Sequence, residues 1–169
     1  SLHDALPICL GSSSPSATIK AACERAAAAG AWVIAAAGNE GNAGIGYPGG
    51  FASTISVAAI DRNFRVANFS SRGDKLDCSG PGVDIVSCKP GGGYQSMSGT
   101  SMATPFVAGL LGLYRAALVA RNLPIPTTLE LREQLFSRST DAYTPGDDRR
   151  TGPGWVTPLL LALNLTADP

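Results

Sequence analysis

The sequence predicts an α/β fold, a doubly wound and mostly parallel sheet with helices on both faces. Residues 16–29 carry apolar side chains at helical spacing, and residues 31–37 then form an apolar run of strand length. A second apolar run of this kind covers residues 54–60. Strands that are apolar on both faces are typical of parallel sheets with helices on each side. Ligands bind beyond the carboxyl ends of such strands, which here directs attention to Gly38 and Asn39.

The residues that flank these elements support the assignment. Ser16 is a suitable N-cap for the first helix, and Gly30 stands where a left-handed residue would end it. Further along, we expect three short strands, around residues 76–78, 83–88 and 94–97, and a buried helix from about residue 101. A break at residues 122–128, helices at 129–137 and 155–163, and a polar surface loop at 141–154 complete the prediction.

Composition and charge exclude several classes of protein. The 169 residues are 44% apolar and 15% charged, which fits one globular domain and argues against disorder. The formal net charge is +0 and no basic block occurs, so the chain lacks the electrostatic footprint of a nucleic-acid-binding protein. The longest nearly apolar stretch, residues 26–38, is too short to span a bilayer. We therefore expect neither nucleic acid nor a membrane as a partner.

Rare residues limit the chemistry further. The four cysteines have spacings that match no zinc motif, and a single histidine, His3, excludes a His-rich metal site. A complete Ser/His/Asp triad within this chain would have to use His3. The formal Gly-x-Gly-x-x-Gly at residues 44–49 does not open a helix, so we reject a dinucleotide site.

Two segments carry residues suited to acyl transfer. Ser101 begins the expected buried helix, where its backbone N–H and the helix dipole favour negative charge. Asn39 offers an amide donor at the end of a buried strand, and a serine with such donors can form an oxyanion site. Each residue alone also has an ordinary structural explanation. A serine at a helix start is usually a cap, and an asparagine after a strand is usually a turn residue.

Together, the segments AAAGNEG (residues 35–41) and GTSMATP (residues 99–105) resemble the subtilisin-like serine proteases. The resemblance runs in unbroken order from about residue 9 to residue 159, with GYPG, NFSS, GPG and VAG at residues 46–49, 68–71, 80–82 and 107–109. It implies a serine-type endopeptidase acting on polypeptides, with Ser101 as the nucleophile and Asn39 as the oxyanion-hole amide. It also implies two sets of substrate-binding residues, Leu10 and Gly11 along the substrate backbone, and Ala36, Gly38, Glu40 and Gly46 around the primary specificity pocket.

The Asp and His motifs of the resembled family should precede residue 9, and the sequence shows neither of them. His3 and Asp4 lack the setting of these motifs, so we interpret His3 as incidental. We expect residues 1–8 to be a non-matching segment and residues 9–169 to be the carboxyl-terminal part of one peptidase domain, incomplete at its N-terminal side. This chain alone would then be inactive. The alternative is a non-catalytic fragment or degenerate relative that at most binds peptides.

The resemblance implies no cofactor for the chemistry. It does imply a weak structural site for Ca²⁺ or Na⁺, formed by the Asp77 carboxylate and the backbone carbonyls of Gly49, Phe51 and Thr54. Cys78 and Cys88 flank a short segment, and whether they pair is left open; pairing would favour an oxidising compartment. Secretion is the localisation that the family leads us to expect.

Overall fold

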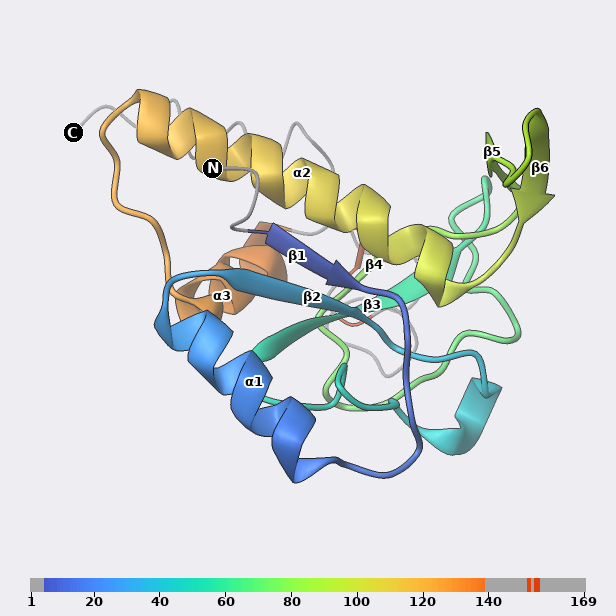
Figure 1. The fold of residues 1–169 in the computed structure, drawn as a ribbon, viewed down its shortest axis with the longest axis horizontal. Helices are drawn as coiled ribbons and strands as arrows, with labels where there is room; N and C mark the ends of the chain where they lie inside the picture. Colours follow the sequence, from blue (N-terminus) through green and yellow to red (C-terminus); the bar gives the residue numbers. More distant parts are fainter. Residues whose placement is uncertain (1–4, 139–151, 153, 156–169) are drawn as a thin grey trace.

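The computed structural model describes residues 5–138, 152 and 154–155, and a four-stranded parallel sheet lies at its centre (Figure 1). The strands follow one another in sequence order: β1 (Ala5–Ile8), β2 (Trp32–Ala36), β3 (Thr54–Ile60) and β4 (Cys78–Pro81). Every residue of β2 and β3 is buried, which confirms the two strands expected from their apolar runs. β1 was not expected from the sequence, and it pairs with β2 in parallel.

One face of the sheet is covered by α1 (Ala17–Ala28) (Figure 1). The Ser16 side chain caps this helix by accepting a hydrogen bond from the backbone N–H of Ile19. Gly30 follows with a φ of +86°, so the glycine takes the left-handed conformation expected at the helix end. Cys23 of α1 is buried in a small core beneath this face, against Val33 of β2.

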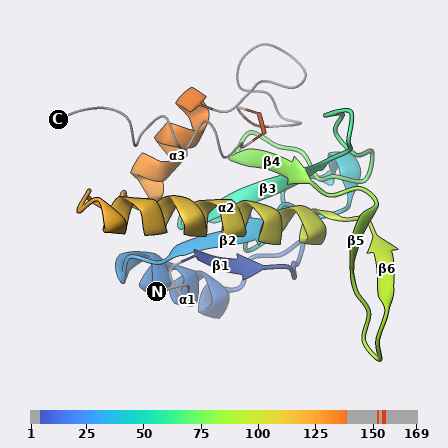
Figure 2. The ribbon, with the colours of Figure 1, turned by 90° about the horizontal axis from the view of Figure 1, so that it is seen from above.

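The opposite face carries α2 (Thr100–Ala120) and α3 (Thr128–Arg138) (Figure 2). Trp32 and Ile34 of β2 point to this side, while Val33 between them points to α1. The main core therefore lies between the sheet and α2, with buried leucines of α3 closing one end. Helices on both faces of a parallel sheet confirm the predicted fold class.

The prediction of a buried helix from about residue 101 is correct for only one face of α2. Val107 and Leu111 are fully buried, whereas Phe106, Leu113 and Val119 have 42%, 71% and 60% of their surface exposed. With a mean hydropathy of 1.5, α2 is long and apolar enough to cross a membrane by length and composition. A helix packed on a sheet meets the same criteria, and 39% of the apolar window is buried in this way.

An antiparallel hairpin of β5 (Ile85–Cys88) and β6 (Tyr94–Met97) projects beyond the sheet and leads into α2 (Figure 2). These strands confirm the predictions at residues 83–88 and 94–97, whereas the strand expected at residues 76–78 begins only at Cys78. Cys78 is buried in β4 and Cys88 is exposed on the hairpin; both thiols are free, so they do not pair.

Several predictions fall largely outside the described residues. These include the setting of His3 and Asp4, most of the loop at 141–154 and most of the helix at 155–163. Gly152 and Gly154 of the expected surface loop are buried. Trp155 forms a β-bridge with Ser79 of β4 instead of starting a helix.

Candidate active site

Ser101 is the second residue of α2, directly after a tight approach of two backbone segments. The N–H of Gly99 donates to the carbonyl of Gly82 at 2.8 Å. A Cβ on Gly82 would lie 2.8 Å from the Gly99 oxygen and 2.6 Å from the Cβ of Ala59. A side chain at position 82 would collide with Gly99, so a glycine there allows the chain after β4 to bond to the turn that precedes Ser101.

Asn39 follows β2, and its side chain is fixed by the first residue of α2. The Oδ1 atom of Asn39 accepts hydrogen bonds from the backbone N–H of Thr100 at 2.9 Å and from the Thr100 hydroxyl at 3.1 Å. The Thr100 hydroxyl in turn accepts the N–H of Gly38 at 3.2 Å. Thr100 is fully buried, so this small network ties the end of β2 to the start of α2.

With the Asn39 oxygen held by Thr100, its amide nitrogen is the group left to act as a donor. A Cβ built on Gly99 would lie 3.6 Å from Asn39 Nδ2 and 3.7 Å from the backbone nitrogen of Ser101. The two nitrogen atoms therefore lie near the same point beside Gly99. Two donors converging on one point can stabilise an oxygen atom that gains negative charge.

One cavity of about 390 Å³ brings together all the site residues expected from the sequence. Its lining includes the expected nucleophile and amide, the expected substrate strand and the expected specificity pocket: Ser101, Asn39, Leu10, Gly11, Ala36, Gly38, Glu40 and Gly46. The segment expected to pair with substrate is followed by an antiparallel bridge between Ser12 and Tyr47, which holds it beside the cavity. Segments separated by up to about 90 residues therefore form a single site.

The Glu40 carboxylate shapes the wall of this cavity. It accepts the backbone N–H of Asn39 at 2.8 Å and the Ser71 hydroxyl at 3.2 Å. A Cβ on Gly38, which has a φ of +112°, would lie 2.7 Å from the Glu40 carboxylate and 2.8 Å from the Ser71 hydroxyl. The open backbone at Gly38 therefore gives Glu40 its position beside Asn39.

The hydroxyl of Ser101 donates to the carbonyl of Cys9 at 3.1 Å. The Cys9 thiol donates to the carbonyl of Ser101 at 3.4 Å, and partial burial raises the pKa of this thiol. The only histidine of the chain, His3, lies outside the described residues, so no imidazole is described beside Ser101. The site thus brings the Ser101 hydroxyl close to two nitrogen donors, and the described residues include no imidazole.

Sequence reasoning assigned no role to Thr100, Gly82 or Ser71, although all three lie in or near the quoted motifs. Thr100 sits inside GTSMATP, and its link to Asn39 spans 61 residues. Local patterns identify candidate chemical groups, but they do not reveal which buried hydroxyl orients them.

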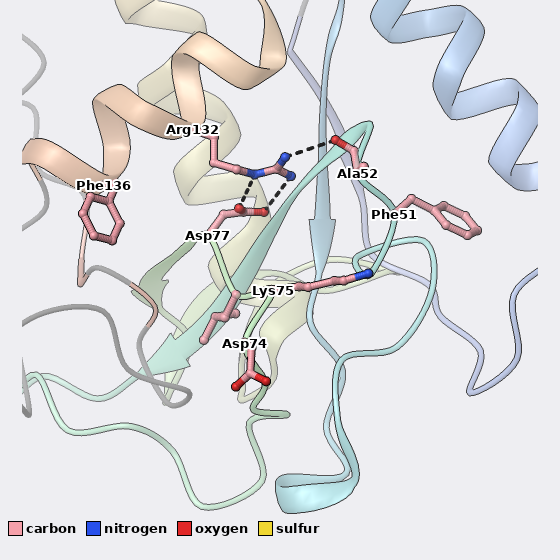
Figure 3. Close-up of a pocket in the computed structure, with 8 residues that line it drawn as sticks. Phe51, Ala52, Asp74, Lys75, Asp77, Arg132 and Phe136 are labelled. Carbon is pink, nitrogen blue, oxygen red and sulfur yellow. Dashed lines mark hydrogen bonds and ion pairs between the residues drawn. The ribbon is translucent and has the colours of Figure 1, made fainter.

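The expected cation site lies elsewhere, beside a second cavity of about 280 Å³ (Figure 3). The Thr54 hydroxyl lies within hydrogen-bond distance of three carbonyl oxygens, those of Pro48 at 2.8 Å, Phe51 at 3.0 Å and Gly49 at 3.2 Å, and it has one proton to donate. The Arg132 guanidinium donates to the Thr54 carbonyl and to both carboxylate oxygens of Asp77. Two of the four groups that the sequence led us to expect as cation ligands, Asp77 and the Thr54 carbonyl, are thus already bound by a positively charged side chain.

Comparison with known proteins identifies the family. The model of the subtilase family matches residues 6–154. The match begins at residue 6, inside the segment 1–8 that we expected not to resemble the family. The chain belongs to the subtilase family. Subtilases are serine endopeptidases.

Two curated subtilases illustrate the similarity. The chain is 42% identical over 147 residues to alkaline elastase YaB of Bacillus sp. (strain YaB), covering 87% of this chain and 37% of that protein. It is 43% identical over 141 residues to subtilisin amylosacchariticus of Bacillus subtilis subsp. amylosacchariticus, covering 81% and 36%. The chain thus spans little more than a third of these relatives.

Solved structures agree on the fold. The prenylagaramide maturation protease PagA superposes with a TM-score of 0.83 at 25% sequence identity, covering 96% of this chain and 62% of that one. The self-cleaved protease domain of PatA gives a TM-score of 0.80 at 25% identity, covering 93% and 58%. The parallel sheet with helices on both faces is therefore that of subtilisin-like proteases.

Proposed function

We propose that this subtilase chain is the carboxyl-terminal part of a serine endopeptidase domain that hydrolyses polypeptides. The observation that carries the proposal is that Asn39 Nδ2 and the backbone nitrogen of Ser101 lie near the same point beside Gly99. The Ser101 hydroxyl lines the same cavity as the expected substrate strand. A serine hydroxyl beside paired N–H donors is the combination that acyl transfer uses.

In the proposed reaction, the Ser101 oxygen attacks the carbonyl carbon of the scissile peptide bond. A histidine from the rest of the domain takes the serine proton and later gives it to the leaving amine, while an aspartate orients that histidine. The carbonyl oxygen becomes an oxyanion and accepts hydrogen bonds from Asn39 and from the backbone of Ser101. A polypeptide substrate and the rest of the domain are thus the proposed partners, and secretion is the proposed localisation.

The test is Asn39→Ala in the full-length protein, with Asn42→Ala as a matched control. Asn42 is a nearby exposed asparagine whose Oδ1 accepts a hydrogen bond from Arg72 at 3.1 Å. We expect Asn39→Ala to lower kcat by ~10²–10³, a magnitude carried over from a side-chain donor measured in subtilisin itself. KM should change little, because the donor acts on charge that develops in the transition state. An effect confined to KM would show that Asn39 binds substrate instead.

A non-catalytic protein that at most binds peptides is the second candidate. It is favoured by one observation, that the residues which the structure describes include no histidine. A fluorophosphonate applied to the full-length protein separates the two functions, because it labels a serine that a base activates. Labelling that is lost in Ser101→Ala supports the peptidase, and absence of labelling supports the binding protein.

A further inference from the structure

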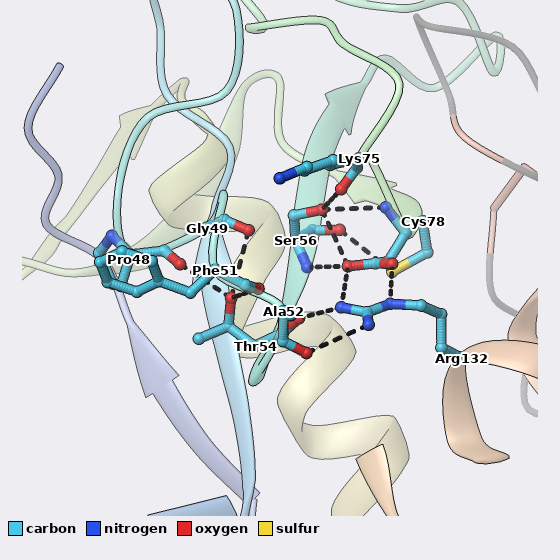
Figure 4. A network of polar contacts seen from close by, with 10 residues as sticks. Pro48, Gly49, Phe51, Ala52, Thr54, Ser56, Lys75, Cys78 and Arg132 are labelled. Carbon is cyan, nitrogen blue, oxygen red and sulfur yellow. Dashed lines mark hydrogen bonds and ion pairs between the residues drawn. The ribbon is translucent and has the colours of Figure 1, made fainter. Parts of the chain in front are cut away.

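Arg132 of α3 enters a polar cluster at the amino-terminal end of β3 and beside β4 (Figure 4). Its guanidinium donates to the carboxylate of Asp77 through two nitrogen atoms, Nε and Nη2. Nη2 also donates to the Thr54 carbonyl, and Nη1 donates to the Ala52 carbonyl at 3.2 Å. One planar cation therefore binds one carboxylate and two backbone oxygens, a set of partners that would also suit a metal ion.

Ser56 makes further contacts with Asp77. Asp77 Oδ2 accepts the backbone N–H of Ser56 at 2.8 Å. The Ser56 hydroxyl lies 3.0 Å from the same oxygen and 2.6 Å from the Lys75 carbonyl. The Asp77 side chain is only 6% exposed, so these contacts leave little room for a hydrated ion to approach it.

The surrounding charges also oppose a divalent ion. Asp77 is the buried carboxylate of this cluster, and Arg132 already neutralises it. Lys75 lines the same cavity and adds a second positive side chain, opposite a single further carboxylate from the exposed Asp74. A metal ion entering here would lie within a few ångströms of the guanidinium, where repulsion between like charges in a partly buried site is strong.

We propose that Arg132 is the resident cation of this site. The guanidinium binds two of the four groups that resemblance to subtilisin-like proteases assigns to a weakly bound metal ion, Asp77 and the Thr54 carbonyl, and its bond to Ala52 ties α3 to the loop before β3. Metal ions therefore neither bind at Asp77 nor stabilise this corner of the fold. The proposal concerns stability and metal binding, so it stands or falls independently of the peptidase activity.

The test measures calcium binding and thermal melting in the full-length protein and in four variants. Arg132→Gln removes the guanidinium, and Arg132→Gln with Asp77→Asn also removes the carboxylate. Asp77→Asn alone reports any calcium site of the parent that depends on Asp77. Arg25→Gln changes an exposed arginine of α1 and controls for loss of surface charge.

We expect calcium titration calorimetry to find the same sites in the parent, in Asp77→Asn and in Arg25→Gln. Arg132→Gln should melt at a lower temperature than the parent, bind one additional calcium ion with millimolar affinity, and melt at a higher temperature as the calcium concentration rises. The double variant should show neither the additional calcium site nor the calcium-dependent rise in melting temperature. A calcium site in the parent that disappears in Asp77→Asn would overturn the proposal, because the arginine would then yield to metal. Absence of any gained site in Arg132→Gln would also overturn it. The comparison of the parent with Asp77→Asn tests the proposal even if Arg132→Gln does not fold.

Discussion

Replacing the buried Thr100 by valine tests how the candidate oxyanion donor is oriented. Valine preserves the shape of the side chain but removes a hydroxyl that donates to Asn39 and accepts the N–H of Gly38. Asn39 keeps one of its two hydrogen bonds, that from the Thr100 backbone. Loss of one neutral hydrogen bond is worth about 0.5–1.5 kcal/mol. If that energy is lost only in the transition state, kcat falls about 2- to 10-fold, since 1.36 kcal/mol corresponds to a factor of ten.

Thr104→Val is the matched control, because Thr104 is also fully buried and its hydroxyl donates within α2 to the Thr100 carbonyl at 2.8 Å. Both variants should lower the melting temperature of the full-length protein. Only Thr100→Val should lower kcat on a peptide substrate, with KM nearly unchanged. An equal loss of kcat in both variants, or none in Thr100→Val, would show that Thr100 does not position the amide of Asn39.

Two further predictions concern the thiols and the chain taken alone. Iodoacetamide at pH 8 should alkylate the exposed Cys88 well before the buried Cys78. Burial and the nearby Asp77 charge raise the pKa of the Cys78 thiol well above its usual range, so little of it is present as the reactive thiolate. Peptide mass spectrometry over time measures the two rates, and equal rates would contradict the prediction. The 169-residue chain alone should aggregate and scatter light on warming, because within the described residues β1 pairs with another strand on one side only. It should also resist labelling of Ser101 by a fluorophosphonate, because no base is described at the site. A monomeric, cooperative melt or rapid labelling would refute it.

The sequence predicts most accurately the strands that are buried on both faces. β2 and β3 are buried on both faces, so their apolar runs alone locate them almost to the residue. α1 is similarly clear, because Ser16 and Gly30 mark its ends. The candidate nucleophile and amide could be found because each lies in a distinctive local segment.

What the sequence did not reveal depends on distant partners. The exposed face of α2 is as apolar as its buried face, and periodicity cannot show which of the two the sheet covers. Arg132 reads as an ordinary charged residue of a helix, and only the fold brings it to Asp77, 55 residues earlier. The same holds for Thr100 and Asn39. Long-range pairs of this kind decide the cation site and the orientation of the amide.

The hydrogen bond from Ser101 to the carbonyl of Cys9 has a consequence for the timing of reactivity. A peptide carbonyl can align a hydroxyl group, but it is far too weak a base to remove its proton. In the proposed reaction, the serine therefore needs an acceptor other than this carbonyl. An imidazole that replaces the carbonyl exchanges one hydrogen bond for another, at a cost of about 1 kcal/mol or less. In the proposed complete domain, Ser101 would gain its base only when the residues that supply the imidazole have folded beside this site.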